Sequence, residues 1–234
     1  MIRPILFNTD MVRAILDERK TETRRKIKFP KNRFTGEIPK ADSVKVYKNT
    51  LLSDKIGFHE DPHYGFDMKP PCKRGDVLYI RETWGWCPCW DCGMDMEEGG
   101  CAEESVTRVY NQKKREYGCY CYKASMEDGE ELSVDTWHPS IHMPKEVARI
   151  WLKVKDVGAE RLQDISGHEV LKEGINSHVH PEADYFNLNQ REMFEKIWNS
   201  TIQKSDQDLY GWNANPWVWV IRFERCEKPE GWCV

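Results

Sequence analysis

The sequence has little that would place the chain in a membrane or outside the cell. No apolar run approaches the length of about 18 residues that a transmembrane helix needs. The first residues, MIRPILFNTD, show neither the apolar core nor the small-residue cleavage site of a signal peptide. Internal repeats and low-complexity tracts are also absent from the sequence. We therefore expect a cytoplasmic globular chain without a membrane partner.

Basic charge is in slight deficit over the whole chain. The 234 residues contain 35 Lys and Arg against 39 Asp and Glu, a net charge of −4, which excludes a uniformly basic coat for nucleic acid. Residues 19–33 depart from this average, because they carry eight basic side chains and one acidic side chain. Such a stretch can hold phosphates, although a solvated basic edge is the other interpretation. The candidate nucleic-acid-binding residues are Arg19, Arg24, Arg25 and Lys26.

Aromatic residues supply a core, and short apolar runs predict mainly strands. Ten Trp and 12% aromatic residues can bury a large area. The patterning predicts strands at 2–7, 44–47, 77–84, 117–123, 149–157 and 217–223, and helices starting near 9, 166 and 189. Because strands dominate, we expect an α+β fold built on a small mixed β-barrel flanked by helices. Residues 36–70 hold few periodic apolar positions and are predicted to be mostly a polar loop.

One predicted helix has clear start and stop signals. Ser166 and Glu169 have the spacing of a capping box, and Gly174 is placed to end the helix. Glu173 then falls in the last turn, where a carboxylate opposes the helix dipole. A tolerated surface acid is one explanation, and a residue kept for function is the other. Glu173 is therefore a candidate site residue.

Cysteine is abundant, and its odd count of nine does not suit a disulfide framework in a chain without an export signal. Cys89, Cys92 and Gly93 form the CxxCG pattern of a zinc knuckle. We expect a structural zinc ion in a Cys-rich insertion at about 86–121, whereas reduced, unligated thiols are the alternative. The expected ligands are Cys87, Cys89, Cys92 and Cys101, with Cys119 and Cys121 as alternatives for the less certain positions.

The same insertion is strongly acidic. Residues 91–104 carry six acidic side chains and no basic one. A metal would stabilise a segment that is too small and polar to form its own core. This acidic surface could also dock a protein partner, which gives a non-catalytic interaction module as one hypothesis for the chain.

The basic stretch also contains hydroxyl residues next to lysine. A threonine hydroxyl becomes a nucleophile only when a neighbouring base takes its proton, and a lysine with a lowered pKa can do so. Lys20 and Thr23 are candidates for such a pair. Their spacing alone does not show that the two side chains face each other.

Four segments of the chain share one resemblance. They are residues 4–25 (PILFNTDMVRAILDERKTETRR), 75–84 (GDVLYIRETW), 137–164 (WHPSIHMPKEVARIWLKVKDVGAERLQD) and 216–223 (PWVWVIRF). Together they resemble the ASCH domain of the PUA-like superfamily, and most of all the ASCH proteins often encoded by phages and prophages. The resemblance implies one ASCH domain over residues 1–234, with a PUA-like β-barrel flanked by helices and with the insertions at 36–70 and 86–121. It also implies a nucleic-acid or nucleotide ligand.

A bacterial branch of that family hydrolyses N4-acetylcytidine to cytidine and acetate with a Lys, a Thr and a Glu. Its Lys-Thr-x-Thr motif matches residues 20–23, so the resemblance assigns the catalytic roles to Lys20 and Thr23. The third role falls on Glu173, the residue already marked by its unusual place in a helix. The sequence thus predicts binding of RNA or a modified nucleoside, with hydrolysis of an N-acylated cytidine as the enzymatic version. A non-catalytic, zinc-stapled module that binds RNA or protein is the alternative.

Overall fold

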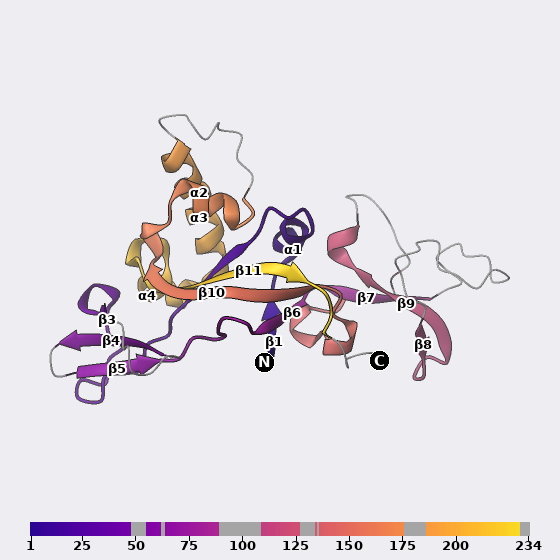
Figure 1. The fold of residues 1–234 in the computed structure, drawn as a ribbon, viewed down its shortest axis with the longest axis horizontal. Coiled ribbons are helices and arrows are strands. Elements are labelled where there is room, and N and C mark those ends of the chain that lie inside the picture. Colours follow the sequence, from indigo (N-terminus) through magenta and orange to yellow (C-terminus); the bar gives the residue numbers. More distant parts are fainter. Residues whose placement is uncertain are drawn as a thin grey trace. The chain divides into compact units, whose positions relative to one another are not determined.

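The computed structural model describes residues 1–47, 55–61, 64–88, 109–126, 134, 136–175 and 186–229 (Figure 1). The chain divides into two compact units. The first unit comprises Met1, Asp17–Val77 and Lys153–Arg225. The second unit comprises Ile2–Leu16, Leu78–Leu152 and Cys226–Val234. None of the described helices is long and apolar enough to cross a membrane.

A five-stranded sheet is the largest element of the fold. Its strands are hydrogen-bonded in the order β1-β6-β10-β11-β2. Their bounds are β1 Ile2–Leu6, β6 Val77–Arg81, β10 Trp151–Arg161, β11 Trp217–Cys226 and β2 Glu22–Lys26. Because β1 and β2 stand at opposite ends of this order, the sheet does not close into a barrel in the part of the chain that the structure describes. The predicted α+β class is confirmed, since the described chain is mixed and rich in sheets.

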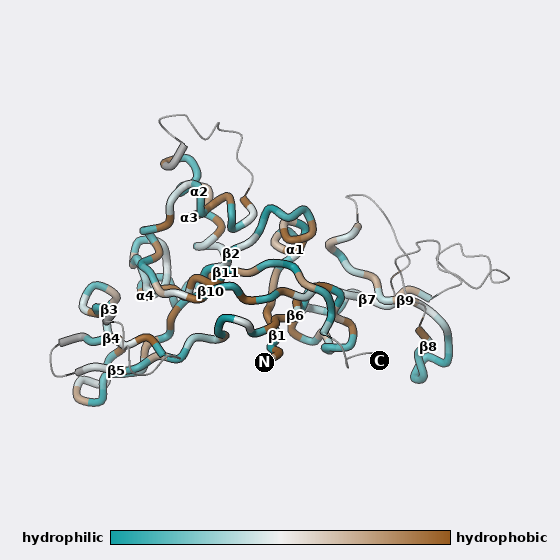
Figure 2. Tube along the Cα trace, viewed as in Figure 1, coloured by the Kyte–Doolittle hydropathy of each residue, from teal (hydrophilic) through white to brown (hydrophobic). Residues whose placement is uncertain are grey.

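The two long strands carry the sheet's apolar content. Along β11 the hydrophobic residues of the first half give way to hydrophilic residues in the second half (Figure 2). Val218 and Val220 are buried, whereas Glu224 and Arg225 are exposed. The neighbour β10 runs beside β11 in the first unit (Figure 1). This gradient places the apolar core at the start of β11 and leaves its end to charged side chains.

The second half of the predicted polar loop forms a sheet instead. Strands β3 (Lys45–Tyr47), β4 (Ile56–Asp61) and β5 (Tyr64–Met68) pair in the order β3-β4-β5. The reason is an aromatic cluster: Phe58 is fully buried, and its ring lies 5.1 Å from Phe29 and 6.1 Å from Phe66. These partners are distant in sequence, so a local reading of the segment misses them.

A third sheet belongs to the second unit. It consists of β7 (Trp84–Pro88), β9 (Glu116–Tyr122) and β8 (Val109–Asn111), in the order β7-β9-β8. Strand β7 pairs antiparallel with β9, so that Gly85 faces Cys121 and Cys87 faces Cys119. Because side chains alternate along a strand, these four positions share one face, and Trp84, Trp86, Tyr120 and Tyr122 share the other.

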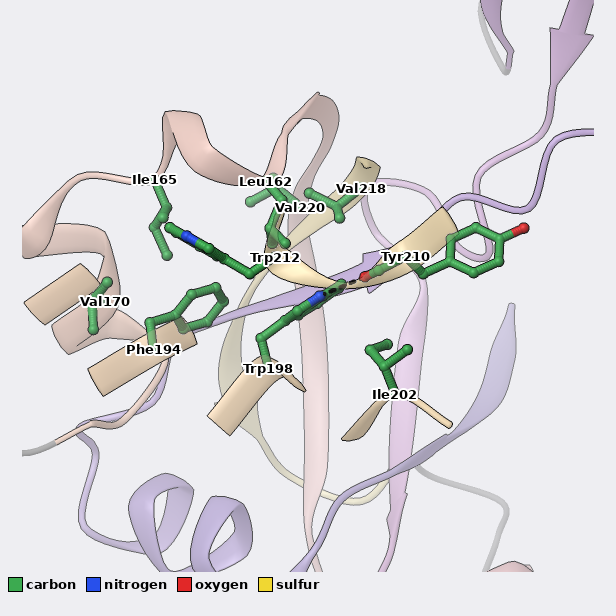
Figure 3. Packing of buried hydrophobic residues seen from close by; sticks show 10 residues of the cluster. All are labelled: Leu162, Ile165, Val170, Phe194, Trp198, Ile202, Tyr210, Trp212, Val218 and Val220. Carbon is green, nitrogen blue, oxygen red and sulfur yellow. Dashed lines mark hydrogen bonds between the residues drawn. The ribbon is translucent and has the colours of Figure 1, made fainter. Parts of the chain in front are cut away.

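The helices of the first unit pack on one apolar cluster (Figure 3). They are α2 (Gly167–Lys172), α3 (Phe186–Thr201) and the short α4 (Gln207–Tyr210), while α1 (Thr9–Leu16) belongs to the second unit. Phe194 and Trp198 of α3 face the cluster, and the indole of Trp198 donates to the carbonyl of Tyr210 at 2.8 Å. The cluster comprises Leu162, Ile165, Val170, Phe194, Trp198, Ile202, Tyr210, Trp212, Val218 and Val220.

Helix α2 starts and stops where the sequence predicts. Ser166 is its N-cap and forms both halves of a capping box with Glu169. Glu173 is the C-cap residue, and Gly174 follows with a φ of 89°, a left-handed conformation that glycine adopts without strain. The capping box and the helix stop are therefore confirmed, and they fix where Glu173 lies.

Candidate functional site

Lys20 and Glu173 meet in a buried ion pair of the first unit. A short antiparallel bridge joins the two residues through their backbones. The ammonium of Lys20 donates to Glu173 Oε2 at 2.6 Å and to the Glu173 carbonyl at 2.9 Å. Their side chains are 0% and 5% exposed. The end of α2 and the start of β2 thus bring together two of the three predicted catalytic residues across 153 positions of sequence.

Arg24 binds the other oxygen of the same carboxylate. Its Nη1 donates to Glu173 Oε1 at 3.2 Å, and its Nε donates to Glu160 at 2.7 Å. The side chain is fully buried. Arg24 is one of the predicted nucleic-acid contacts, and the structure places its guanidinium inside a cluster of carboxylates that includes Glu160 and Glu173.

Thr23 is buried on β2 but does not join this hydrogen-bonded pair. The register of β2 against β11 is regular, with Thr23 opposite Ile221, so Thr23 and Arg25 share one face of β2 while Glu22 and Arg24 share the other. No hydrogen bond links Thr23 to Lys20 or Glu173 among the described residues. The charge of Arg25 nevertheless acts on both Lys20 and Glu173. The Thr23 side of β2 is therefore within electrostatic reach of the pair.

Burial shapes the protonation of these groups. Desolvation lowers the pKa of Lys20, and the attraction of Glu173 offsets only part of this shift. For Arg24, burial acts in the same direction, but Glu173 and Glu160 outweigh it and raise the pKa. Burial raises the pKa of Glu160. The lowered pKa favours the neutral form of Lys20. A general base needs this form in order to accept a proton.

A wider shell of charges surrounds the pair. Glu22 accepts from Arg222 at 3.1 Å and from Lys172 at 3.4 Å. Its second oxygen, Oε2, and the Nη2 nitrogen of Arg24 are buried without hydrogen bonds. Two nearby polar atoms therefore keep unused hydrogen-bonding capacity inside the cluster. Glu22, Glu160 and Arg222 were not singled out from the sequence, because only the pairing of β11 with both β2 and β10 and the fold around α2 bring them here.

The remaining basic candidates lie around this cluster. Arg19 donates to the Gly174 carbonyl at 2.6 Å and to Asp17 at 2.8 Å. Lys26 donates to Asp206 at 2.9 Å and lies 4.6 Å over the ring of Tyr210. Both side chains keep part of their surface in solvent, 34% for Arg19 and 24% for Lys26. Arg25 is also only partly buried, so Arg24 is the one predicted phosphate contact of the four that is buried.

Three cysteines of the second unit form a candidate metal centre. The sulfur atoms of Cys87, Cys119 and Cys121 all lie within 4.8 Å of one another, with 3.9 Å between Cys119 and Cys121. Two thiolates bound to tetrahedral zinc at about 2.3 Å lie about 3.8 Å apart, so this spacing fits the ion. Of the predicted ligands, Cys87 takes part and the alternatives Cys119 and Cys121 join it. Cys89, Cys92 and Cys101 lie outside the described residues.

Comparisons with known proteins assign no family to this chain. No protein-family model, no curated protein and no solved structure matches it. The function must therefore be argued from the two sites themselves.

Proposed function

We propose that the first unit binds RNA or a modified nucleoside next to the Lys20–Glu173 pair and hydrolyses an N-acylated cytidine there. The observation that carries the proposal is the buried 2.6 Å contact between these two side chains. Burial lowers the pKa of Lys20 and so favours its neutral amine, which can act as a general base beside the carboxylate. The resemblance to the ASCH domain and its PUA-like fold supports the same assignment through residues 20–23.

In the proposed reaction Thr23 is the nucleophile. Its hydroxyl oxygen attacks the acetyl carbonyl of N4-acetylcytidine, and the neutral amine of Lys20 accepts the hydroxyl proton. Glu173 takes this proton from the Lys20 ammonium and passes it to the exocyclic nitrogen as the carbon–nitrogen bond breaks, which releases cytidine and returns Lys20 to its neutral form. Water then hydrolyses the ester on Thr23 and yields acetate. The reaction requires the Thr23 hydroxyl to reach Lys20 when substrate is bound, a contact absent from the described chain on its own.

Removing the Thr23 hydroxyl tests the chemistry. We expect wild type to release acetate from N4-acetylcytidine and Thr23→Val to lose about 10³-fold or more of that rate. Thr23→Ser keeps a hydroxyl and should retain turnover. Thr21→Val is the matched control, because Thr21 is exposed and lies only two residues away. Acetate is measured directly. Absence of turnover by wild type, or equal turnover by Thr23→Val, rejects the hydrolase.

The binding of RNA, independent of hydrolysis, is tested by its dependence on salt and on the basic side chains. The affinity for a single-stranded RNA should fall about tenfold or more between 50 and 200 mM salt, because binding displaces counterions from phosphates. The double variant Arg19→Ala/Lys26→Ala should bind more weakly and with a shallower salt slope. Lys155→Ala serves as control, since this exposed lysine pairs with Glu224. A flat salt dependence, measured by fluorescence anisotropy, contradicts the proposed contacts.

The second unit supports an independent structural role for zinc. Cys87 and Cys119 are buried and pair directly across β7 and β9, and Gly85 pairs with Cys121 on the same face of the sheet. An ion held by these thiolates would tie β7 to β9 at the base of the acidic insertion. A metal-stapled module that docks a protein partner through that insertion is therefore the second candidate function, and it does not depend on hydrolysis.

Metal analysis tests this site. Protein prepared with ample zinc should contain about one zinc per chain, and Cys119→Ser/Cys121→Ser should contain far less. Cys226→Ser is the control, because Cys226 belongs to the same unit but not to the cluster. Elemental analysis gives the stoichiometry. Equal zinc in the double variant, or none in wild type, contradicts the proposed site.

A further inference from the structure

A small cavity of about 280 Å³ opens on the aromatic face of the β7-β9-β8 sheet. Trp84 and Trp86 of β7 and Tyr120 of β9 line it. His138 closes one side, and the polar groups of Asn111, Lys114 and Thr136 complete the lining. All these residues belong to the second unit. The cavity is separate from the Lys20–Glu173 pair, and the proposed hydrolysis does not use it.

The aromatic walls of this cavity are held in fixed positions. Trp84 and His138 exchange two backbone hydrogen bonds, at 3.2 and 2.7 Å, and their rings lie 4.7 Å apart at 32°. Tyr120 packs edge-on against both tryptophans, at 5.8 Å from Trp84 and 5.3 Å from Trp86. Rings that are already positioned lose little freedom when a flat ligand binds against them.

Two polar groups of the cavity offer hydrogen-bond donors, beside the Tyr120 and Thr136 hydroxyls and the His138 imidazole, which can also accept. The indole nitrogen of Trp84 is buried and has no acceptor among the described residues, whereas that of Trp86 donates to Glu116 at 3.2 Å. Asn111 uses its carbonyl oxygen to accept from the amides of Lys113 and Lys114, which leaves its amide nitrogen to donate. A buried donor without a partner costs about 1–3 kcal/mol. A ligand that supplies an acceptor would remove that cost.

Charge and size narrow the class of ligand. The lining residues that the structure describes include a lysine and no carboxylate, so an aromatic cage for a cation is disfavoured. The volume lies just below the range of about 300–1,000 Å³ typical of drug-sized ligands, which suits one small ring system. Aromatic side chains stack on nucleobases, and the carbonyl oxygens of a pyrimidine are acceptors that match the donors.

We propose that this cavity binds the base of a single-stranded pyrimidine nucleotide, with a carbonyl oxygen accepting from Trp84 Nε1 and the phosphate near Lys114. The site provides a second contact for a nucleic-acid strand, in a unit that contains none of the proposed catalytic residues. The hydrogen-bond donors, the aromatic stacking surface and the positive charge of Lys114 together select this class of ligand. The proposal stands without the hydrolase, because none of its observations involves Thr23, Lys20 or Glu173.

Titration of the full chain with uridine 5′-monophosphate tests the site. Calorimetry should show binding by wild type and by Thr23→Val alike, so a failed hydrolase does not affect the result. Trp84→Phe keeps a ring but removes the donor and should weaken binding about tenfold. Lys114→Met should weaken the binding of the nucleotide and leave the affinity for uridine unchanged. Trp137→Phe is the matched control, since Trp137 is half-buried in the same unit but does not line the cavity.

A spectroscopic readout assigns the contact to its atom. In a ¹⁵N–¹H spectrum the indole signal of Trp84, identified by its loss in Trp84→Phe, should shift on addition of the nucleotide. No binding by wild type, or equal affinity of Trp84→Phe, overturns the proposal. Tighter binding of tetramethylammonium, or equal competition by inorganic phosphate alone, also overturns it, because the occupant would then be a cation or a simple anion.

Discussion

Replacing Glu173 with glutamine is expected to lower the free energy of unfolding by about 3–5 kcal/mol at neutral pH, the range found when a buried ion pair loses one partner. Glu173 receives Lys20 on one oxygen and Arg24 on the other. Both cationic side chains are fully buried. Arg24 keeps Glu160 at 2.7 Å, and Lys20 keeps the backbone carbonyl of residue 173 at 2.9 Å but loses its carboxylate.

The loss should depend on pH in a defined direction. The pKa of Lys20 is already lowered by burial, and Glu173 opposes that shift. Without the carboxylate the pKa of Lys20 falls further, so the folded variant binds fewer protons than the unfolded chain. Its stability should therefore rise as the pH increases from the new pKa of Lys20 toward the ordinary lysine value, and the defect should shrink in alkaline buffer. Urea unfolding at several pH values measures this.

Two further variants serve as controls for Glu173→Gln. Glu224→Gln carries the same substitution in an exposed pair with Lys155, whose side chains are about half exposed, and should cost less than about 1 kcal/mol. Lys20→Met/Glu173→Leu replaces both charges with apolar groups and should recover much of the stability. It should recover no acetate release, which separates the structural role of the pair from its chemistry. Equal losses for Glu173→Gln and Glu224→Gln would contradict the buried pair.

Local signals in the sequence correctly predicted the position of Glu173, one partner of the Lys20–Glu173 pair. The capping box at Ser166 and the stop at Gly174 depend on neighbours within a turn, and both are present in the structure. They place Glu173 at the end of α2. The partner Lys20 followed from the likeness of residues 20–23 to a known motif. Their 2.6 Å contact joins residues that no local rule could connect.

Long-range pairing explains what the sequence did not predict. Arg24 was expected to contact nucleic acid because eight basic residues lie in one stretch, and β2 brings it beside Glu160 and Glu173. Strands β4 and β5 form because Phe58 packs on Phe29, some thirty positions earlier. The approach of Cys119 and Cys121 to Cys87 depends on the register of β7 against β9. Each outcome is set by which strands pair, and neither composition nor spacing contains that information.

Replacing Arg149 with alanine is the second change with a large expected effect, and it concerns the second unit. Glu82 follows β6 and is 1% exposed. Arg149 binds both of its oxygens, at 3.0 and 3.1 Å. The same guanidinium donates to Ser125 and covers the ring of Tyr122 at 4.0 Å. Alanine would leave a buried carboxylate without its cation, and the free energy of unfolding should fall by about 3–5 kcal/mol.

The pH dependence of this variant should be opposite to that of Glu173→Gln. Burial raises the pKa of Glu82 even in the presence of Arg149, which lowers it. Without Arg149 the pKa of Glu82 rises further, so the folded state holds a proton that the unfolded chain releases. The stability that the protonated Glu82 contributes is fully present below the ordinary pKa of glutamate. It is lost as the pH rises through the raised pKa of Glu82 in the folded state. The defect should be large at pH 7.5 and small near about pH 5.

Urea unfolding of three variants at these two pH values tests the Glu82 assignment. Arg33→Ala, an exposed arginine, should lie within about 0.5 kcal/mol of wild type at both. Glu82→Gln combined with Arg149→Ala removes the buried charge and should recover part of the loss at pH 7.5. A defect of Arg149→Ala that is the same at both pH values, or that the added Glu82→Gln deepens, would show that lost packing on Tyr122 outweighs the unpaired carboxylate. Recovery at low pH shows instead that Arg149 chiefly keeps Glu82 ionised inside the fold.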